Sequence, residues 1–597
     1  MARRRKRLIV GWLVAAVFLA GGFAANFSEN LTAVNGSTPG SESARVITLL
    51  EENFGIGVAE QDLVVFESDS LSIDDDRFMA VVANAITVVE QQVATSDIIS
   101  PLDPDGAGQI SADRRAAFVS LSIAGTPSQR QSEALELNEA LAAIGTDGVD
   151  VWLTGESPLH ADVDAVAQSD LAKAEMIGLP VALVVLLLAF GALVAAGLPL
   201  LLGGVGIGVS FGVLGLLSYF TEFSLLTENI TTLIGLGVGI DFAMFIVSRF
   251  REGLDQGDSP ERAAQLAVAT SGRSVLYSGL TTIVAMAGLF LLDSPIFHDL
   301  AIAVMITVAV MVAAALTLLP AVLAALGHSV NRGRMPRWMS SGDGAERRWA
   351  WITTKVMKRP GTVAVAGGVL ALSLAAPALG LELGMNSGAD AVADQPSGKG
   401  LAVLGENFGE GWVSPIEVVF TANDGRFDAE VASVNTFLDE LGRDADVAGA
   451  GIETNVGGLT AGVIDQVDEM SAKLPLIITL VLAVSFVLLL AVFGSSMDYE
   501  LFLLGRMREE WERTGDNATA VAAAIQAAIF GAFAFTSVID VQQVGVALAS
   551  AILIDATLVR ALLVPASMKL MGRWNWWRPR WFIGNRIDYQ QLRGATR

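Results

Sequence analysis

The sequence predicts a polytopic α-helical membrane protein built from two similar halves. Hydrophobic residues make up 52% of its 597 residues, charged residues only 17%, and the mean hydropathy of +0.54 lies outside the range of soluble domains. Several apolar windows of about 20 residues occur, and each is long enough to cross a hydrocarbon core of roughly 30 Å. A motif with an aspartate inside such a window occurs twice, which indicates a duplicated architecture.

The repeated motif places one aspartate in an apolar helical run of each half. GVGIDFAMFIVSRFREGLDQGD begins at Gly237, and GSSMDYELFLLGRMREEWERTGD begins at Gly494. Aligned, Asp241 falls on Asp498, and an arginine pair follows each aspartate where the apolar run would reach water. An ionisable side chain inside a bilayer costs several kcal/mol, so it marks a functional site by default, most often a proton or ion relay.

The chain opens with a basic segment, MARRRKR, followed by an apolar stretch from Leu8 to Ala25. Basic residues before a short apolar run are also typical of a secretory signal peptide. Because more spans follow and the acidic segment after this run needs an anchor, an uncleaved first span is the favoured interpretation.

Charge asymmetry predicts the topology. Residues 26–172 hold 25 acidic and 5 basic residues, a net charge of −20, and residues 381–472 hold 17 acidic and 3 basic residues, a net charge of −14. Residues 327–360 hold 8 basic and 2 acidic residues, a net charge of +6. By the positive-inside rule the N-terminus and 327–360 are cytoplasmic, so the two acidic segments lie outside.

The two exterior segments also repeat. LEENFG at 50–55 matches LGENFG at 404–409, and a β-rich run follows each copy. Alternating strands and amphipathic helices, such as 77–92 and 132–144, predict small α/β domains with mixed sheets. Their many carboxylates are interpreted as a solvated surface, and no nucleophile–base pattern indicates an enzyme.

Apolar runs define the remaining spans and the domain boundaries. The predicted spans after the first lie near 175–196, 197–219, 228–248, 273–292, 299–324, 361–381, 474–504, 518–539 and 544–571. The predicted units are a first span (1–25), an exterior domain (26–172), spans 2 to 6 (173–326), a basic cytoplasmic loop (327–360), the first span of the second half (361–381), a second exterior domain (382–473), a shortened second bundle (474–571) and a cytoplasmic tail (572–597).

Glycine patterns are expected to serve helix packing. Gly204, Gly208 and Gly212 form a small-residue face, and GLGVG before Asp241 lacks the soluble strand that precedes a dinucleotide site. There is no cysteine, the three histidines have no metal-ligand spacing, and no ATP-binding P-loop motif occurs. We therefore expect no metal, no cofactor, no nucleic-acid partner and no ATP-driven cycle.

With these motifs in place, the chain resembles the resistance–nodulation–division (RND) superfamily, and within it the MmpL transporters. The resemblance rests on GIDFAMFIVSRFREG, SMDYELFLLGRMREEWERTGD, ILIDATLVRALLVPA and the ending GRWNWW. It implies proton-driven export of lipids or other hydrophobic molecules across the actinobacterial inner membrane, with both termini cytoplasmic and a homo-oligomer possible. Protons, membrane lipids and a hydrophobic substrate are the implied partners.

The family uses two aspartate–tyrosine pairs as its proton relay. The matching positions here are Asp241 with Phe242 and Asp498 with Tyr499. Phe242 departs from the pattern, since phenylalanine has no hydroxyl to hydrogen-bond a carboxylate. Losing that partner should further disfavour ionisation of the acid.

A second departure is that the second half is shorter. If Pro180 is paired with Pro475, the stretch from the proline to the aspartate has 61 residues in the first half and 23 in the second, a difference of 38. A later stretch, after the repeated motif, has 42 residues in the first half and 28 in the second, a difference of 14. These gaps near 493 and 526 leave about ten spans where the family has twelve. They place Asp498 either at the cytoplasmic interface or in the membrane core, and both placements stay open.

Two further charges, Asp555 and Arg560, lie in the last span as possible secondary sites. In an α-helix five residues separate side chains by about 140°, so a direct pair is poor, and structural pairing elsewhere is as plausible as a transport role. Two functional hypotheses follow. One is proton-coupled export of hydrophobic molecules, and the other is a non-transporting lipid-binding or scaffold protein, or an inactive product of internal deletion.

Overall fold

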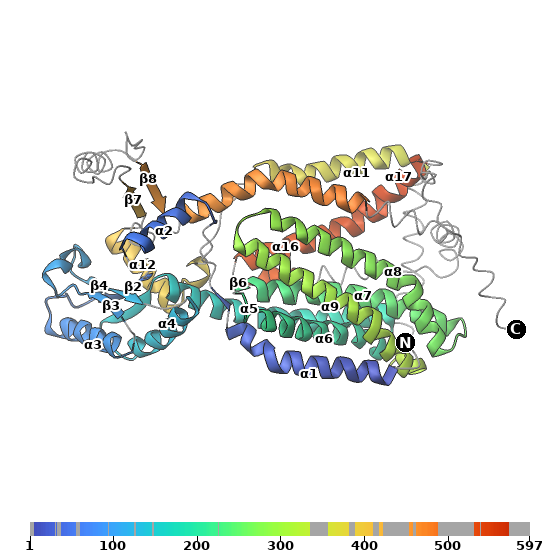
Figure 1. Cartoon of the computed structure of the whole chain (residues 1–597), viewed down its shortest axis with the longest axis horizontal. Coiled ribbons are helices and arrows are strands. Elements are labelled where there is room, and N and C mark those ends of the chain that lie inside the picture. Colours follow the sequence, from blue (N-terminus) through green and yellow to red (C-terminus); the bar gives the residue numbers. More distant parts are fainter. Residues whose placement is uncertain are drawn as a thin grey trace.

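The computed structural model is elongated, with a helical bundle at one end and, at the other, the domains that the charge pattern predicts to be exterior, called exterior domains below (Figure 1). The structure describes residues 5–29, 31–32, 38–54, 60–92, 95–123, 127–145, 148–221, 223–224, 226–334, 356, 358–380, 389–409, 417–421, 453–457, 461–487, 530–537 and 539–571.

Eight helices within these residues are long and apolar enough to cross a membrane, and a shorter apolar helix, α11 (Pro360–Ala375), adds to them. The polytopic helical class is therefore confirmed. The eight are α1 (Arg5–Glu29), α5 (Glu156–Phe190), α6 (Leu193–Leu217), α7 (Leu226–Asp255), α8 (Pro260–Ala287), α9 (Pro295–Leu326), an unlabelled helix Ala461–Val487, and α16 (Ile539–Ile554) with its continuations η10 (Asp555–Leu563) and α17 (Val564–Met571).

The helix ends differ from the predicted spans for local reasons. α5 ends at Gly191, whose φ of +62° is left-handed, so the chain turns there instead of near 196. α8 begins at Pro260, well before the predicted 273, because Ser259 caps it by accepting a hydrogen bond from the Arg262 N–H. Most of the span predicted near 518–539 lies outside the described residues.

The first exterior domain is a four-stranded sheet in the order β3-β4-β2-β5. Its strands are β2 (Glu60–Glu67), β3 (Thr95–Ile99), β4 (Ala116–Ile123) and β5 (Asp150–Thr154). All pairs are antiparallel, with Val64 opposite both Val119 and Leu153, so the expected mixed sheet is wrong. α3 (Asp76–Gln92) and α4 (Pro127–Ala142) bury one face of the sheet through a core that includes Phe66, Phe78 and Leu137.

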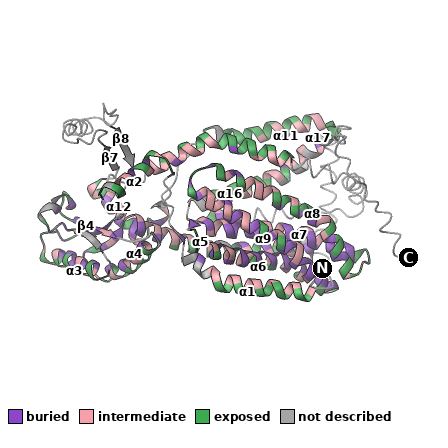
Figure 2. Cartoon of the chain, viewed as in Figure 1, coloured by how far each residue is buried: buried purple, intermediate pink, exposed green. Residues whose placement is uncertain are grey.

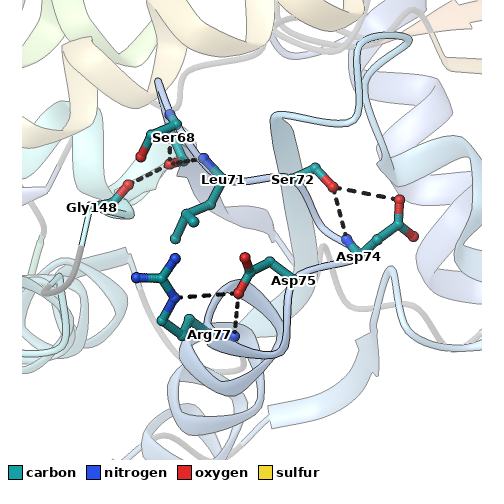
Figure 3. Close-up of polar contacts among 8 residues, drawn as sticks. Ser68, Leu71, Ser72, Asp74, Asp75, Arg77 and Gly148 are labelled. Carbon is teal, nitrogen blue, oxygen red and sulfur yellow. Dashed lines mark hydrogen bonds and ion pairs between the residues drawn. The ribbon is translucent and has the colours of Figure 1, made fainter.

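Polar side chains shape the turn between β2 and α3 (Figure 3). The Ser68 hydroxyl donates to the Gly148 carbonyl and accepts from the Leu71 N–H at 3.0 Å. Asp75 accepts from the Arg77 N–H at 3.0 Å and so caps the first turn of α3. Through the bond from Ser68 to Gly148, this turn connects the loop that precedes β5 with the start of α3.

The two halves exchange helices on the exterior side. α12 (Pro396–Phe408), from the second half, covers the other face of the first sheet, where Phe408 meets Phe118 edge-on with ring centroids 4.9 Å apart. α2 (Glu42–Phe54), from the first half, lies against the second domain's pair β7 (Glu417–Thr421) and β8 (Glu453–Gly457) (Figure 1). The repeated LEENFG and LGENFG segments end these two exchanged helices.

Each exchanged helix is capped by an aspartate at the outer end of a membrane helix. Asp162 of α5 accepts from the Ser397 N–H at 3.0 Å and from its hydroxyl at 2.5 Å. Asp465 accepts in the same way from Ser43, at 3.1 and 2.6 Å. In each case the aspartate satisfies one helix-terminal N–H and one serine hydroxyl, so each exchanged helix is joined to the other half's membrane helix.

The reciprocal caps correct the alignment of the two halves. Because Asp162 corresponds to Asp465, the offset is 303 residues, and Gly191 corresponds to Gly494. The pairing of Pro180 with Pro475 was therefore wrong by eight residues. From Gly191 to Asp241 is 50 residues, whereas from Gly494 to Asp498 is 4, so 46 residues are missing at this point instead of 38.

Candidate functional site

The candidate site is centred on α7, which lies inside the first-half bundle against α6, α8 and α9 (Figure 2). Its glycines permit close contact with these neighbours. A Cβ on Gly235 would lie 2.6 Å from Ile207, and one on Gly239 would lie 3.1 Å from the backbone of Gly203. The GLGVG segment therefore serves helix packing, as the sequence predicted.

The stripe of α7 that carries Asp241 meets the second half of the chain. Leu233, Gly237 and Asp241 are four residues apart, so they share one helical face. A Cβ on Gly237 would lie 2.5 Å from the Phe530 ring, and Leu233 shares an apolar cluster with Phe530 and Phe533. Asp241 itself is half-buried one turn further along.

Phe242 points into the apolar core of the first half. It is 3% exposed and belongs to the same cluster as Ile240, Ala243 and Met311. The side chain that replaces the family's phenol thus packs as an ordinary core residue.

Asp555 is also half-buried, and it begins a π-helical segment that runs to Leu563. Leu548, Ile552 and Asp555 share one face, and the first two belong to the cluster that holds Leu233. Asp241 lies eight residues beyond Leu233, about 12 Å, and Asp555 seven beyond Leu548, about 10 Å. Since both helices run inward from the exterior side, the two aspartates lie at similar depths.

The π-helix changes the expected relation between Asp555 and Arg560. With i→i+5 hydrogen bonds this segment winds more loosely than an α-helix, so the 140° separation expected for an α-helix does not apply. The Arg560 side chain is outside what the structure describes, as are Asp498 and Tyr499 entirely. By offset, Asp498 follows four residues after Gly494, the counterpart of Gly191 at the end of α5.

Arg251 fixes the C-terminal end of α7, which is predicted to be cytoplasmic. Its guanidinium donates to the Phe190 carbonyl at 2.7 Å and to Asn331 at 2.8 Å, and it lies 5.7 Å from the Phe190 ring centroid. A cation at the C-terminal carbonyls of α5 is favourable for both helices. This role was not predicted, although the repeat of Arg251 as Arg508 and of Phe190 as Phe493 signals it.

A second unpredicted set of contacts crosses between the halves near the exterior surface. Lys473 pairs with Asp293 at 2.5 Å, and Gln466 donates to Ser294 at 2.8 Å, joining helix 461–487 to the α8–α9 hairpin. In return, Asp170 of α5 accepts from the Ser537 N–H ahead of α16. Thus helix 461–487 of the second half contacts the first half, and α5 of the first half contacts the second half, both near the exterior side.

The described residues contain no group of three or more histidine or acidic side chains that could hold a metal.

Comparison with known proteins identifies the family to which this architecture belongs. The model of the MMPL family matches residues 27–363 and 494–588. The chain belongs to the MMPL family. As an MmpL-type RND transporter, it is 31% identical to the mycolic acid-containing lipids exporter MmpL11 of Mycolicibacterium smegmatis, over 99% of this chain and 75% of that protein.

Two further MMPL relatives differ in what their names say they transport. The heme uptake protein MmpL11 of Mycobacterium tuberculosis is 28% identical, over 97% of this chain and 72% of that protein. The trehalose monomycolate exporter MmpL3 of the same species is 25% identical, over 97% and 77%. The names agree on transport of hydrophobic molecules, and they differ in direction.

The alignment with the M. smegmatis relative also bears on the shortened second half of this MMPL protein. It runs over 725 positions, whereas the chain has 597 residues. At least 128 positions of the relative, the difference between these numbers, therefore have no counterpart here. This chain is therefore shorter than that relative over the aligned region, while the predicted gaps near 493 and 526 stay a prediction.

Proposed function

We propose that this protein exports lipids or other hydrophobic molecules across the inner membrane, driven by the proton gradient. The observation that carries the proposal is Asp241, a half-buried carboxylate on a stripe of α7 that meets Phe530 of the second half. The relatives named as exporters of mycolic acid-containing lipids and of trehalose monomycolate support a lipid substrate.

The proposed relay pairs Asp241 with Asp555. Their similar depth and the cluster shared by their helices support this pairing over Asp498, which follows the counterpart of the cytoplasmic end of α5. A carboxylate in an apolar setting favours its neutral form, so a proton arriving from outside would bind Asp241 and be released inward. When Asp241 and Asp555 are both ionised, their carboxylates repel each other and push α7 away from the second half. When one of them is protonated, this repulsion is lost.

Transmission outward would use the contacts that cross between the halves. A shift of one half moves Asp162 and Asp465, and with them the capped helices α12 and α2 in the exterior domains. Titration in the membrane could thereby open and close the surface between the two exterior domains.

The test uses proteoliposomes that contain trehalose monomycolate and a trapped pH dye. An imposed proton gradient should drive lipid translocation and proton flux together in the wild type. Asp241→Asn and Asp555→Asn should each abolish both, Asp498→Asn should keep at least half the rate, and Asp258→Asn, at the cytoplasmic end of α7, serves as the control. Loss with Asp498→Asn and retention with Asp555→Asn would instead restore the family's usual pair.

The second candidate is a non-transporting lipid-binding or scaffold protein, and the missing segments favour it. In that case all three asparagine variants should behave like the wild type, with no translocation and unchanged lipid binding. Gradient-driven inward movement of heme in the same vesicles would support uptake over export.

A further inference from the structure

Three threonine hydroxyls are buried in the outer half of the bundle without a hydrogen-bond partner among the described residues. They belong to Thr227 and Thr231 on α7 and Thr307 on α9, and each side chain is 0% exposed. Buried hydroxyls are normally satisfied, so unpaired ones need an explanation.

Eight of the other helical threonines of this protein satisfy themselves. Each donates to the carbonyl oxygen four residues earlier, as far as the described residues show: these are Thr48, Thr87, Thr270, Thr281, Thr282, Thr317, Thr479 and Thr557. Thr231 and Thr307 sit within helices where the same bond is geometrically open to them, yet they do not make it. Their hydroxyls are oriented for another partner.

The three hydroxyls lie along one contact between parallel helices. Asp299 of α9 accepts a hydrogen bond from the Ser224 N–H at 3.2 Å, just before α7 begins. This contact places Ser224 and Asp299 at the same depth in the bundle. Thr231 is seven residues beyond Ser224, and Thr307 is eight beyond Asp299, so they too lie at one depth. The hydroxyls therefore continue inward from a half-buried carboxylate near the exterior surface.

Met311 lies immediately below this series. A Cβ on Gly206 would lie 2.4 Å from the Met311 sulfur, and one on Gly239 would lie 3.1 Å from it. The unbranched thioether thus fills the space between α6, α7 and α9, about one turn inward of Thr307. Asp241 lies about 15 Å inward of Thr231, ten residues along α7.

We propose that Asp299, Thr227, Thr231 and Thr307 line a water-filled entry track that leads from the exterior along α7 toward Asp241. The proposal rests on the proposed proton coupling and names its exterior route. A hydroxyl both donates and accepts, so a proton can pass through water held by these threonines and leave each hydroxyl unchanged.

The natural absence of cysteine allows a direct test by silver-ion accessibility. Thr307→Cys, in proteoliposomes with Ag⁺ added on the exterior side, should react at least ten-fold faster than either of two controls. Val308→Cys is equally buried on the next face of α9, and Ser210→Cys replaces a buried hydroxyl that already donates to the Gly206 carbonyl at 2.8 Å. Equal protection of all three thiols would show a dry bundle and overturn the track.

Proton flux separates this inference from the proposed function. Thr231→Val with Thr307→Val keeps the shape of both side chains and should lower gradient-driven proton flux at least ten-fold, while Thr231→Ser with Thr307→Ser should keep it. If Asp241→Asn stops the flux and the valine pair does not, protons enter elsewhere and only this inference fails. If Asp241→Asn leaves flux intact, the proposed function fails, and the silver rates alone decide whether water enters.

Discussion

At the scale of single residues, glycines on α6 decide how closely α1 can approach it. A Cβ on Gly212 would lie 2.4 Å from the backbone of Leu19, whereas a Cβ on Gly204, two turns earlier on the same face, would meet nothing within 4 Å. Gly212→Ala should therefore force the helices apart and lower stability by about 1–3 kcal/mol. Gly204→Ala should be neutral or raise stability by up to about 1 kcal/mol, because alanine is the better helix former.

Thermal unfolding of the two variants in one detergent checks this pair. Equal midpoints would mean that α1 does not rest on Gly212. If the two midpoints differ as expected, only Gly212 of this pair is needed for helix packing. The spacing of the glycines shows that they share a face, but it does not show where along that face the neighbouring helix makes contact.

Phe242 allows a test of the family's missing hydroxyl. Phe242→Tyr would introduce a phenol into an apolar cluster where the wild-type ring is 3% exposed. An unsatisfied buried hydroxyl costs about 1–3 kcal/mol, so stability should fall by that order and transport should not rise. Unchanged stability with faster transport in the lipid assay would show that the phenol reaches a carboxylate after all.

At the scale of elements, the docking of α12 on the first sheet should depend on pH through Glu67. Partial burial raises the pKa of Glu67, and the carboxylates of Asp69, Glu406 and Asp150 raise it further against a hydrogen bond from Asn407. The docked form thus prefers the protonated acid, so docking is strongest below the unfolded pKa of about 4.3 and weakens as pH rises through the folded value.

Glu67→Gln should strengthen docking at neutral pH and flatten its pH dependence, since glutamine stays neutral. Hydrogen exchange of α12 measured between pH 4 and 8 reads this out, with the exposed Glu139→Gln as the control. The quantity compared is the protection factor, the exchange rate corrected for the intrinsic pH dependence of amide exchange. A protection factor that rises on acidification in the wild type but not in Glu67→Gln is the expected result. A protection factor that falls on acidification would reverse the sign and exclude Glu67 as the cause.

The elements also show what the sequence could and could not predict. The helices at 77–92 and 132–144 were placed within a few residues, because amphipathic periodicity is local. The antiparallel sheet and the exchange of α2 and α12 were missed, because strand order and helix exchange depend on contacts between segments far apart in the chain. Ser43 and Ser397 sit at the same place in the repeat, yet their aspartate partners lie hundreds of residues away.

At the scale of the whole molecule, the two halves are joined by reciprocal contacts on the exterior side, while their membrane parts are unequal. Asp162 with Ser397 matches Asp465 with Ser43, and both pairs lie outside the stretch where residues are missing. Loss of a membrane segment therefore leaves the exterior coupling intact. Whatever movement the shortened second half still makes can reach both exterior domains.

The exchange itself can be trapped as a disulfide. A Cβ on Gly400 of α12 would lie 3.1 Å from the Thr154 Cβ of β5, close to the 3.5–4.5 Å of a disulfide, and the chain has no other cysteine to interfere. Gly400→Cys with Thr154→Cys, and a protease site placed within residues 335–355, should give two fragments that stay joined until reductant is added.

The disulfide also shows whether α12 packs on the sheet of its own chain or on the sheet of a second copy. If each exterior sheet receives α12 from its own chain, the uncleaved oxidised protein runs as a monomer. If the bridge joins two chains, α12 is exchanged between copies, and the single variant Thr154→Cys mixed with Gly400→Cys should then yield the same covalent dimer. Separate fragments without reductant would mean that α12 leaves the first sheet, and the exterior domains could not follow the membrane helices as a coupled pair.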